Sequence, residues 1–293
     1  MNYPYTIVAD ISADITPAFV KENDLRFISM SYTIGEEERL CSDIEDEAVL
    51  KRFYDGQRHG DLTQTSRISP RSYIDCFTPL LKQGQPILYL SLSSGLSGTY
   101  ESSLLAAEEL REDFPDIGIA CVDSLAATGG MGLLLEAAVH NRDAGMSLAD
   151  NAKWLEENRL RVCHWFMVED LMYLLRGGRV SAATAVVGTA LNIKPILKIE
   201  DDGKLVNFTK KRGAKSALKQ MVDFYAESTD GGDGERIYIC HADAGDKAEF
   251  LEKEIRKINP RCDITSMTLS PIIGAHVGPG MASIIHFGKR ETR

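Results

Sequence analysis

The stretch LYLSLSSGLSGTYESSLLAAEEL, residues 88–110, gathers hydroxyl side chains where a predicted strand turns into a predicted helix. An apolar run over residues 87–92 ends at Ser93 and Ser94, and apolar residues at helical spacing begin at Leu96. Such a turn offers free backbone N–H groups, the positive end of a helix dipole and several hydroxyls, which together suit an anion. The residues alone leave open a phosphate site, a carboxylate site and a nucleophilic serine.

A nucleophilic serine at Ser97 lacks the usual local sequence. A nucleophile elbow places the serine directly between a strand and a helix, whereas Ser97 follows the apolar run by five residues. The alternative of an acyl or phosphoryl transferase, with Ser94 or Ser97 as nucleophile and His276 as the base, stays open. The absence of a nucleophile elbow argues against it.

Three other segments carry side chains that could meet an anion. Thr65 and Ser66 are predicted to lie in a loop just before a helix that Ser69 caps. His276 lies in the Gly- and Pro-rich sequence IIGAHVGPG, predicted as a loop between two strands, where the backbone can approach a ligand closely. Arg179 follows a Gly-Gly turn. Each also has a purely structural interpretation: turn formation, a lone structural histidine, or a surface charge.

The elements that would position these side chains predict an α/β protein of two domains. Strands alternate with helices up to residue 159, which is typical of a Rossmann-like parallel sheet with helices on both faces. Ligands bind at the carboxyl ends of such strands, where Ser93 and Ser94 fall. In residues 160–293 a hairpin signal at Asp202-Gly203 predicts a mixed or antiparallel sheet. One strand is expected over residues 25–31, and a helix from Ser181 to about Ala190.

Composition excludes several classes of protein. The net charge is -10, and no basic block is present, so nonspecific binding to nucleic acid is not expected. Six scattered cysteines without a CxxC pair predict neither a metal site nor a disulfide framework and favour a reducing compartment. The sequence shows no export signal, and the uncharged stretch 264–288 contains Pro and Gly that argue against a membrane span. We therefore expect a cytoplasmic protein without a transmembrane segment.

Seven motifs follow one another along the chain: DISAD (10–14), TSRISP (65–70), SSGLSGTY (93–100), VDS with a Gly-rich helix (122–132), YLLRGGRVS (173–181), LNIKPIL (191–197) and IGAHVGPG (273–280). Together they resemble the DegV family. In two places the chain departs from the family pattern: Ile11 replaces a small hydroxyl residue, and Arg67-Ile68 replaces a more usual Gln-Pro.

The resemblance implies a carrier rather than an enzyme. It implies that a long-chain fatty acid lies in an apolar slot between the domains 1–159 and 160–293, and that a partner fatty acid kinase phosphorylates it to the acyl phosphate. Transient contact with a membrane surface and no cofactor other than the fatty acid are also implied, and a lipid-responsive regulatory protein stays open. The implied carboxylate ligands are Thr65, Ser94, Ser93 and Ser66, with Arg179 and His276 near the head group.

Overall fold

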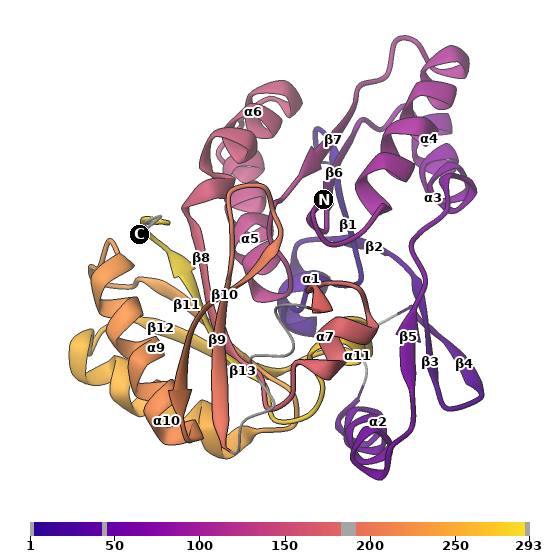
Figure 1. Cartoon of the computed structure of the whole chain (residues 1–293). Coiled ribbons are helices and arrows are strands. Elements are labelled where there is room, and N and C mark those ends of the chain that lie inside the picture. Colours follow the sequence, from indigo (N-terminus) through magenta and orange to yellow (C-terminus); the bar gives the residue numbers. More distant parts are fainter. Residues whose placement is uncertain (1–2, 43–45, 183–191, 291–293) are drawn as a thin grey trace.

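The computed structural model describes residues 3–42, 46–182 and 192–290 (Figure 1). Within these residues the chain forms three β-sheets with helices packed around them. Sheet A and sheet C confirm the predicted α/β class, because sheet A is parallel and sheet C is mixed. The predicted boundary between residues 159 and 160 stays a prediction; the last strand of sheet A ends at Asp123 and the first strand of sheet C begins at Val162.

Sheet A has the order β2-β1-β6-β7. Its two central strands, β1 and β6, are buried at every residue, as expected for a parallel sheet covered on both faces. Figure 1 shows α3 and α4 on one side of this sheet and α5 and α6 on the other. The strands are β1 (Thr6–Asp10), β2 (Arg26–Ile28), β6 (Ile87–Ser91) and β7 (Ile119–Asp123).

Sheet B, a small antiparallel sheet of order β4-β3-β5, corrects two predictions. The single strand expected over residues 25–31 is split between β2 in sheet A and β3 in sheet B. Thr65, expected in a loop, is the last residue of β5, where it pairs with Tyr32. The β5 sequence TQT has no apolar alternation, so only its partner strand reveals it. The strands are β3 (Met30–Ile34), β4 (Glu37–Cys41) and β5 (Thr63–Thr65).

Sheet C has the order β10-β9-β8-β13-β11-β12. All its pairs are antiparallel except β11 with β12, and the Asp202-Gly203 hairpin joins β9 to β10 as predicted. The strands are β8 (Val162–Met167), β9 (Ile193–Ile199), β10 (Leu205–Arg212), β11 (Arg236–His241), β12 (Asp263–Thr268) and β13 (Ala282–Phe287).

The helices cover the sheets and, in one place, join them. The helix predicted from Ser181 to Ala190 falls almost entirely outside the described residues. The described helices are α1 (Pro17–Glu22), α2 (Glu47–His59), α3 (Pro70–Lys82), α4 (Thr99–Asp113), α5 (Gly129–Asp143), α6 (Leu148–Asn158), the 3-10 turn η1 (Arg159–Arg161), α7 (Met172–Arg176), α9 (Ala214–Ser228), α10 (Gly245–Ile258) and α11 (Pro271–Val277).

Helix α5 lies between sheet A and sheet C and packs on strands of both. Its glycine-rich start allows this close approach, because a Cβ on Gly130 would come within 2.1 Å of Nε2 of His164 in β8. One hydrophobic core therefore runs from sheet A through α5 to one face of sheet C. A second core lies on the other face of sheet C, under α9 and α10.

Helix α11 carries His276 across to sheet B and α2. The sequence predicted a loop here, but Pro271 starts a seven-residue helix that ends at the left-handed Gly278. Three side chains from the first third of the chain bind α11 and Leu269, which lies two residues before it. Tyr54 donates to the Leu269 carbonyl at 2.9 Å, Gln57 to the Gly274 carbonyl at 3.1 Å and Thr63 to the Ala275 carbonyl at 3.1 Å.

Candidate functional site

A cavity of about 240 Å³ lies between the two larger sheets, with α11 and the start of α4 contributing to its wall. It is larger than an apolar cavity of ~150 Å³ that binds benzene. Its lining includes no Asp or Glu, although the protein carries a net charge of -10. The apolar lining residues are Met30, Leu92, Leu96, Ala127, Phe166, Leu174, Ile199, Leu205, Ile272, Ile273, Val277, Met281 and Ile285.

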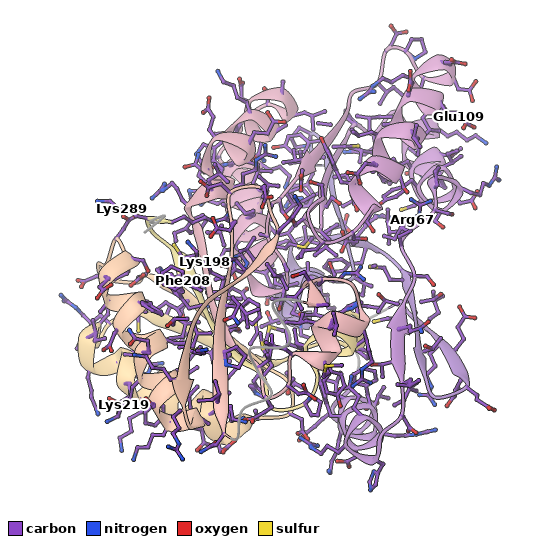
Figure 2. All side chains as sticks on the ribbon, in the orientation of Figure 1. Arg67, Glu109, Lys198, Phe208, Lys219 and Lys289 are labelled. Atoms are coloured by element: carbon purple, nitrogen blue, oxygen red, sulfur yellow. The ribbon has the colours of Figure 1, made fainter. Side chains whose placement is uncertain are left out.

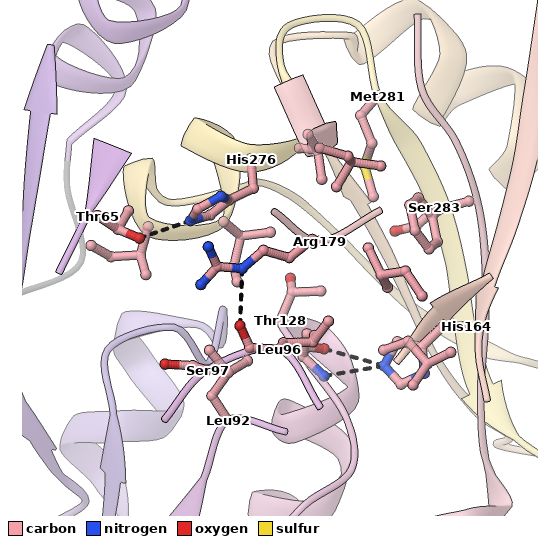
Figure 3. Close-up of a pocket in the computed structure, with 18 of the residues that line it drawn as sticks. Thr65, Leu92, Leu96, Ser97, Thr128, His164, Arg179, His276, Met281 and Ser283 are labelled. Carbon is pink, nitrogen blue, oxygen red and sulfur yellow. Dashed lines mark hydrogen bonds between the residues drawn. The ribbon is translucent and has the colours of Figure 1, made fainter. Parts of the chain in front are cut away.

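Thr65 and His276 meet at one end of this cavity (Figure 3). The Thr65 Oγ1 and His276 Nε2 atoms are 2.7 Å apart. Thr65 is fixed because β5 pairs with β3 and because the next N–H, that of Ser66, donates to the Ser31 carbonyl at 3.0 Å. His276 is fixed by α11. The pair therefore depends on contacts between sheet B and a helix from the far end of the chain.

The imidazole of His276 is neutral in this environment. Burial, with a smaller contribution from the nearby Arg179 guanidinium, lowers the pKa of His276 from 6.5 to about 3. Its Nδ1 atom is buried and has no hydrogen-bond partner among the described residues. Gly177 leaves room for the ring, because a Cβ there would lie 2.3 Å from Nδ1. A ligand that supplies negative charge here would raise the pKa of His276.

Arg179 follows α7 and brings a guanidinium to the same end of the cavity. Its Nε donates to the Leu96 carbonyl at 2.9 Å, and its Nη1 donates to the Gly177 carbonyl. Burial lowers the pKa of Arg179, but an arginine stays protonated at neutral pH. Figure 3 shows the guanidinium pointing toward His276. Thr65, His276 and Arg179, three of the residues predicted from sequence, are thus brought together.

The other three predicted residues lie elsewhere. Ser93 is fully buried, and its hydroxyl donates to the Gly203 carbonyl at 2.8 Å, across to the β9–β10 hairpin. Ser94 is half-buried in the adjoining turn, where its backbone N–H donates to Asp123 at 3.1 Å. Ser66 is exposed on an outer groove. None of them lines the cavity in this structure, so their role as carboxylate ligands stays a prediction.

Several polar lining residues were not among the predicted carboxylate and head-group residues. Arg67 and Ser97 lie at the end of the cavity that Thr65 occupies, and Thr128, His164 and Ser283 also line it. The sequence drew attention to Arg67 only as a departure from the DegV pattern, and to Ser97 only as an anion-binding hydroxyl or a nucleophile. His164 gave no sequence signal, because β8 is buried at every residue and its sequence has no alternation that would show which face each residue occupies. Its pKa is lowered to about 3, chiefly by burial, so it is neutral too.

The transferase alternative needs Ser94 or Ser97 paired with His276 as the base, and among the described residues no hydrogen bond joins either serine to His276. His276 binds Thr65, and the Ser97 hydroxyl is 2.8 Å from Thr99 Oγ1. Over the same residues no group of three His, Cys, Asp or Glu could hold a metal ion. None of the described helices has the length and hydrophobicity that crossing a bilayer requires.

Comparisons with known proteins show the family to which the chain belongs. The model of a family described as "Uncharacterised protein, DegV family" matches residues 4–289. The chain belongs to the DegV family. A DegV domain-containing protein from Clostridium perfringens is 37% identical over 284 residues, which cover 97% of each chain.

Two solved structures of similar proteins share the fold. A fatty-acid-binding DegV family protein from Streptococcus agalactiae is 26% identical, has a TM-score of 0.84 and is matched over 98% of this chain and 99% of that one. The Fatty Acid Kinase (Fak) B3 protein of Streptococcus pneumoniae, loaded with linoleic acid, is 22% identical, has a TM-score of 0.83 and is matched over 97% of this chain and 99% of that one. At that identity the second likeness shows the fold alone.

Proposed function

We propose that this protein holds a long-chain fatty acid in the apolar cavity, with the carboxylate at the end formed by Thr65, His276 and Arg179. The observation that carries the proposal is the placement of these three polar side chains at one end of an otherwise largely apolar cavity that no acidic residue lines. The name of the S. agalactiae protein adds support, because that DegV protein binds a fatty acid.

The energetics suit a carrier. Burying a sixteen-carbon tail contributes about 12 kcal/mol before costs, at ~0.8 kcal/mol per CH₂, and association costs about 4–15 kcal/mol. The tail thus supplies affinity, and the head-group contacts fix orientation. The Thr65 hydroxyl can donate to a carboxylate while the Arg179 guanidinium supplies charge. Ser94 belongs to the proposal as a further hydroxyl in the adjoining turn.

The finer proposal is that the bound acid is presented to a partner fatty acid kinase, which forms the acyl phosphate. It rests on the DegV motifs and on the head-group end, where hydroxyl, imidazole and guanidinium groups surround the expected carboxylate. Location in the cytoplasm, supported by six free cysteines, and transient membrane contact to load the acid complete this proposal.

Mass spectrometry of lipid extracted from the purified protein tests the first step. We expect a fatty acid at close to one molecule per chain, either as purified or after incubation with palmitate. A protein that neither carries nor takes up a fatty acid would contradict the proposal. For the second step, acyl phosphate should form only when a fatty acid kinase and ATP are both added; formation by this protein alone would favour the transferase alternative.

A further inference from the structure

Arg67 lies where the cavity adjoins a groove on the outer surface. Arg67 and Met30 belong to the lining of both hollows. The groove runs between sheet B and α3, and Figure 2 shows Arg67 in the segment that connects β5 to α3. Arg67 is therefore a cationic side chain at the open, head-group end of the proposed fatty acid site.

The backbone around Arg67 is held in place on both sides. The Ser66 N–H donates to the Ser31 carbonyl at 3.0 Å, and the side chain of Ile68 is buried in the main core. The guanidinium rests against the residue that precedes α4, because a Cβ on Gly98 would lie 3.1 Å from Arg67 Nη1. A side chain on an anchored segment keeps its direction better than one on a free loop.

The charge on Arg67 has no partner within the described residues. No hydrogen bond or ion pair joins it to an acid there, and although Glu101 approaches Gly98 it forms no ion pair with Arg67. By contrast Arg71, the second residue of α3, is paired with Asp75 at 2.9 Å. The two charged lining residues, Arg67 and Arg179, are both cations.

We infer that Arg67 is a specificity-determining residue that makes the site favour a doubly charged phosphate head group over a singly charged carboxylate. This inference rests on the proposed function, since an acyl phosphate is the product of the proposed kinase step. A phosphate monoester carries about -1.5 to -2 charges at neutral pH and offers three acceptor oxygens. Two nitrogens of Arg179 already donate to carbonyls, whereas the planar fork of Arg67 is free to bind two phosphate oxygens.

Hexadecyl phosphate and palmitate test the inference, because they share a chain length and differ in head-group charge. At pH 8 the phosphate, with a second pKa of about 6, is doubly charged. We expect Arg67→Gln to weaken hexadecyl phosphate binding about tenfold and palmitate binding about twofold, since hydrogen bonds to charged groups are the stronger ones. Arg67→Lys should retain part of the preference, and the matched control Arg71→Gln should change neither affinity.

The outcomes separate the two proposals. If wild-type protein binds palmitate but Arg67→Gln changes both affinities equally, or changes neither, the inference is wrong and the carrier function stands. Wild-type protein that binds palmitate but not hexadecyl phosphate also overturns the inference. If wild-type protein binds neither ligand, the proposed function itself fails. Circular dichroism of the exposed Arg67 variants should match the wild type.

Discussion

The hydroxyl oxygen of Thr65 lies 2.7 Å from Nε2 of His276, across 211 positions of sequence. One of these residues ends a three-residue strand and the other lies on a seven-residue helix. Neither element would be stable alone, because short strands and helices depend on tertiary packing. The end of the cavity that Thr65 and His276 form is therefore complete only when sheet B and α11 have docked.

Removing the Thr65 hydroxyl should weaken fatty acid binding. Thr65→Val keeps the shape of the side chain but cannot donate to a carboxylate, and we expect a loss of affinity of about tenfold. Titration calorimetry with palmitate measures it. Thr78→Val is the matched control, because the Thr78 hydroxyl donates to the Ile74 carbonyl within α3, away from the cavity. Equal affinities of the Thr65 variant and the wild type would remove the proposed role.

A methyl group at Gly177 should displace the His276 ring. The Cβ of Gly177→Ala would lie 2.3 Å from Nδ1, and since Gly177 has an ordinary φ of -71° no backbone strain is added. We expect weaker palmitate binding and an altered His276 side-chain NMR signal. Gly245→Ala is the control, because its Cβ would have no neighbour within 4 Å. A variant with an unshifted histidine signal contradicts this account.

The stability of the empty protein should fall as the pH drops below 6.5. The unfolded state takes up a proton on His276 near pH 6.5, whereas the folded state does so only near pH 3, because burial lowers the pKa to about 3. Between these values unfolding binds a proton, and the free energy of unfolding rises with pH by about 1.4 kcal/mol per unit for this group. Denaturation of His276→Gln from pH 4 to 6 should show a shallower slope; identical slopes would count against it.

The buried carboxyl of Asp14 should make stability depend on pH in the opposite direction, with lower stability at higher pH. Burial raises the pKa of Asp14 to about 6, although its Oδ1 accepts from the Ser270 N–H at 2.8 Å. The stabilising contribution of the protonated form is complete below pH 3.8 and is lost as the pH rises through 6. Asp14→Asn should therefore raise the melting temperature at pH 8, with an upper limit of about 3 kcal/mol, and should have little effect at pH 3.5.

Asparagine at position 14 can also use atoms that lack partners in the described part of the chain. The Thr128 and Ser270 hydroxyl oxygens are buried and could accept from its amide. Melting curves across this pH range, with the wild type in parallel, distinguish this effect from general destabilisation. A variant that is less stable than the wild type at every pH would contradict this account, because Asp14 is already protonated in the folded protein at pH 3.5 and a loss there cannot come from its charge.

Substitution of Ser93 should affect mainly stability, whereas substitution of Ser94 should affect mainly fatty acid binding. Ser93→Ala removes the bond to the Gly203 carbonyl, which ties the turn after β6 to the β9–β10 hairpin, and should cost about 1–2 kcal/mol in unfolding free energy. Palmitate affinity should change little. Ser94→Ala should show the reverse: unchanged stability, with weaker binding and slower phosphorylation by a kinase. Equal effects of the two variants on binding would contradict this division.

The sequence determined the elements whose patterns are local. Apolar runs such as Ile87–Ser91 and the hairpin at Asp202-Gly203 are legible because burial and turn chemistry act on neighbouring residues. The Ser69 cap and the Pro70 start of α3 also follow from adjacent residue types. The motifs that place the chain in the DegV family were likewise complete in the sequence.

Tertiary structure alone decided which polar groups face the cavity. Ser93 and Ser94 adjoin in sequence, yet a contact with Gly203, more than one hundred positions away, engages the hydroxyl of Ser93. Thr65 could not be recognised as a strand residue because its three-residue strand exists only by pairing with β3. The contact of His276 with Thr65 and the unpaired charge of Arg67 likewise depend on which segments pack side by side. Residue types and their spacing along the chain do not give the distance in space between such segments.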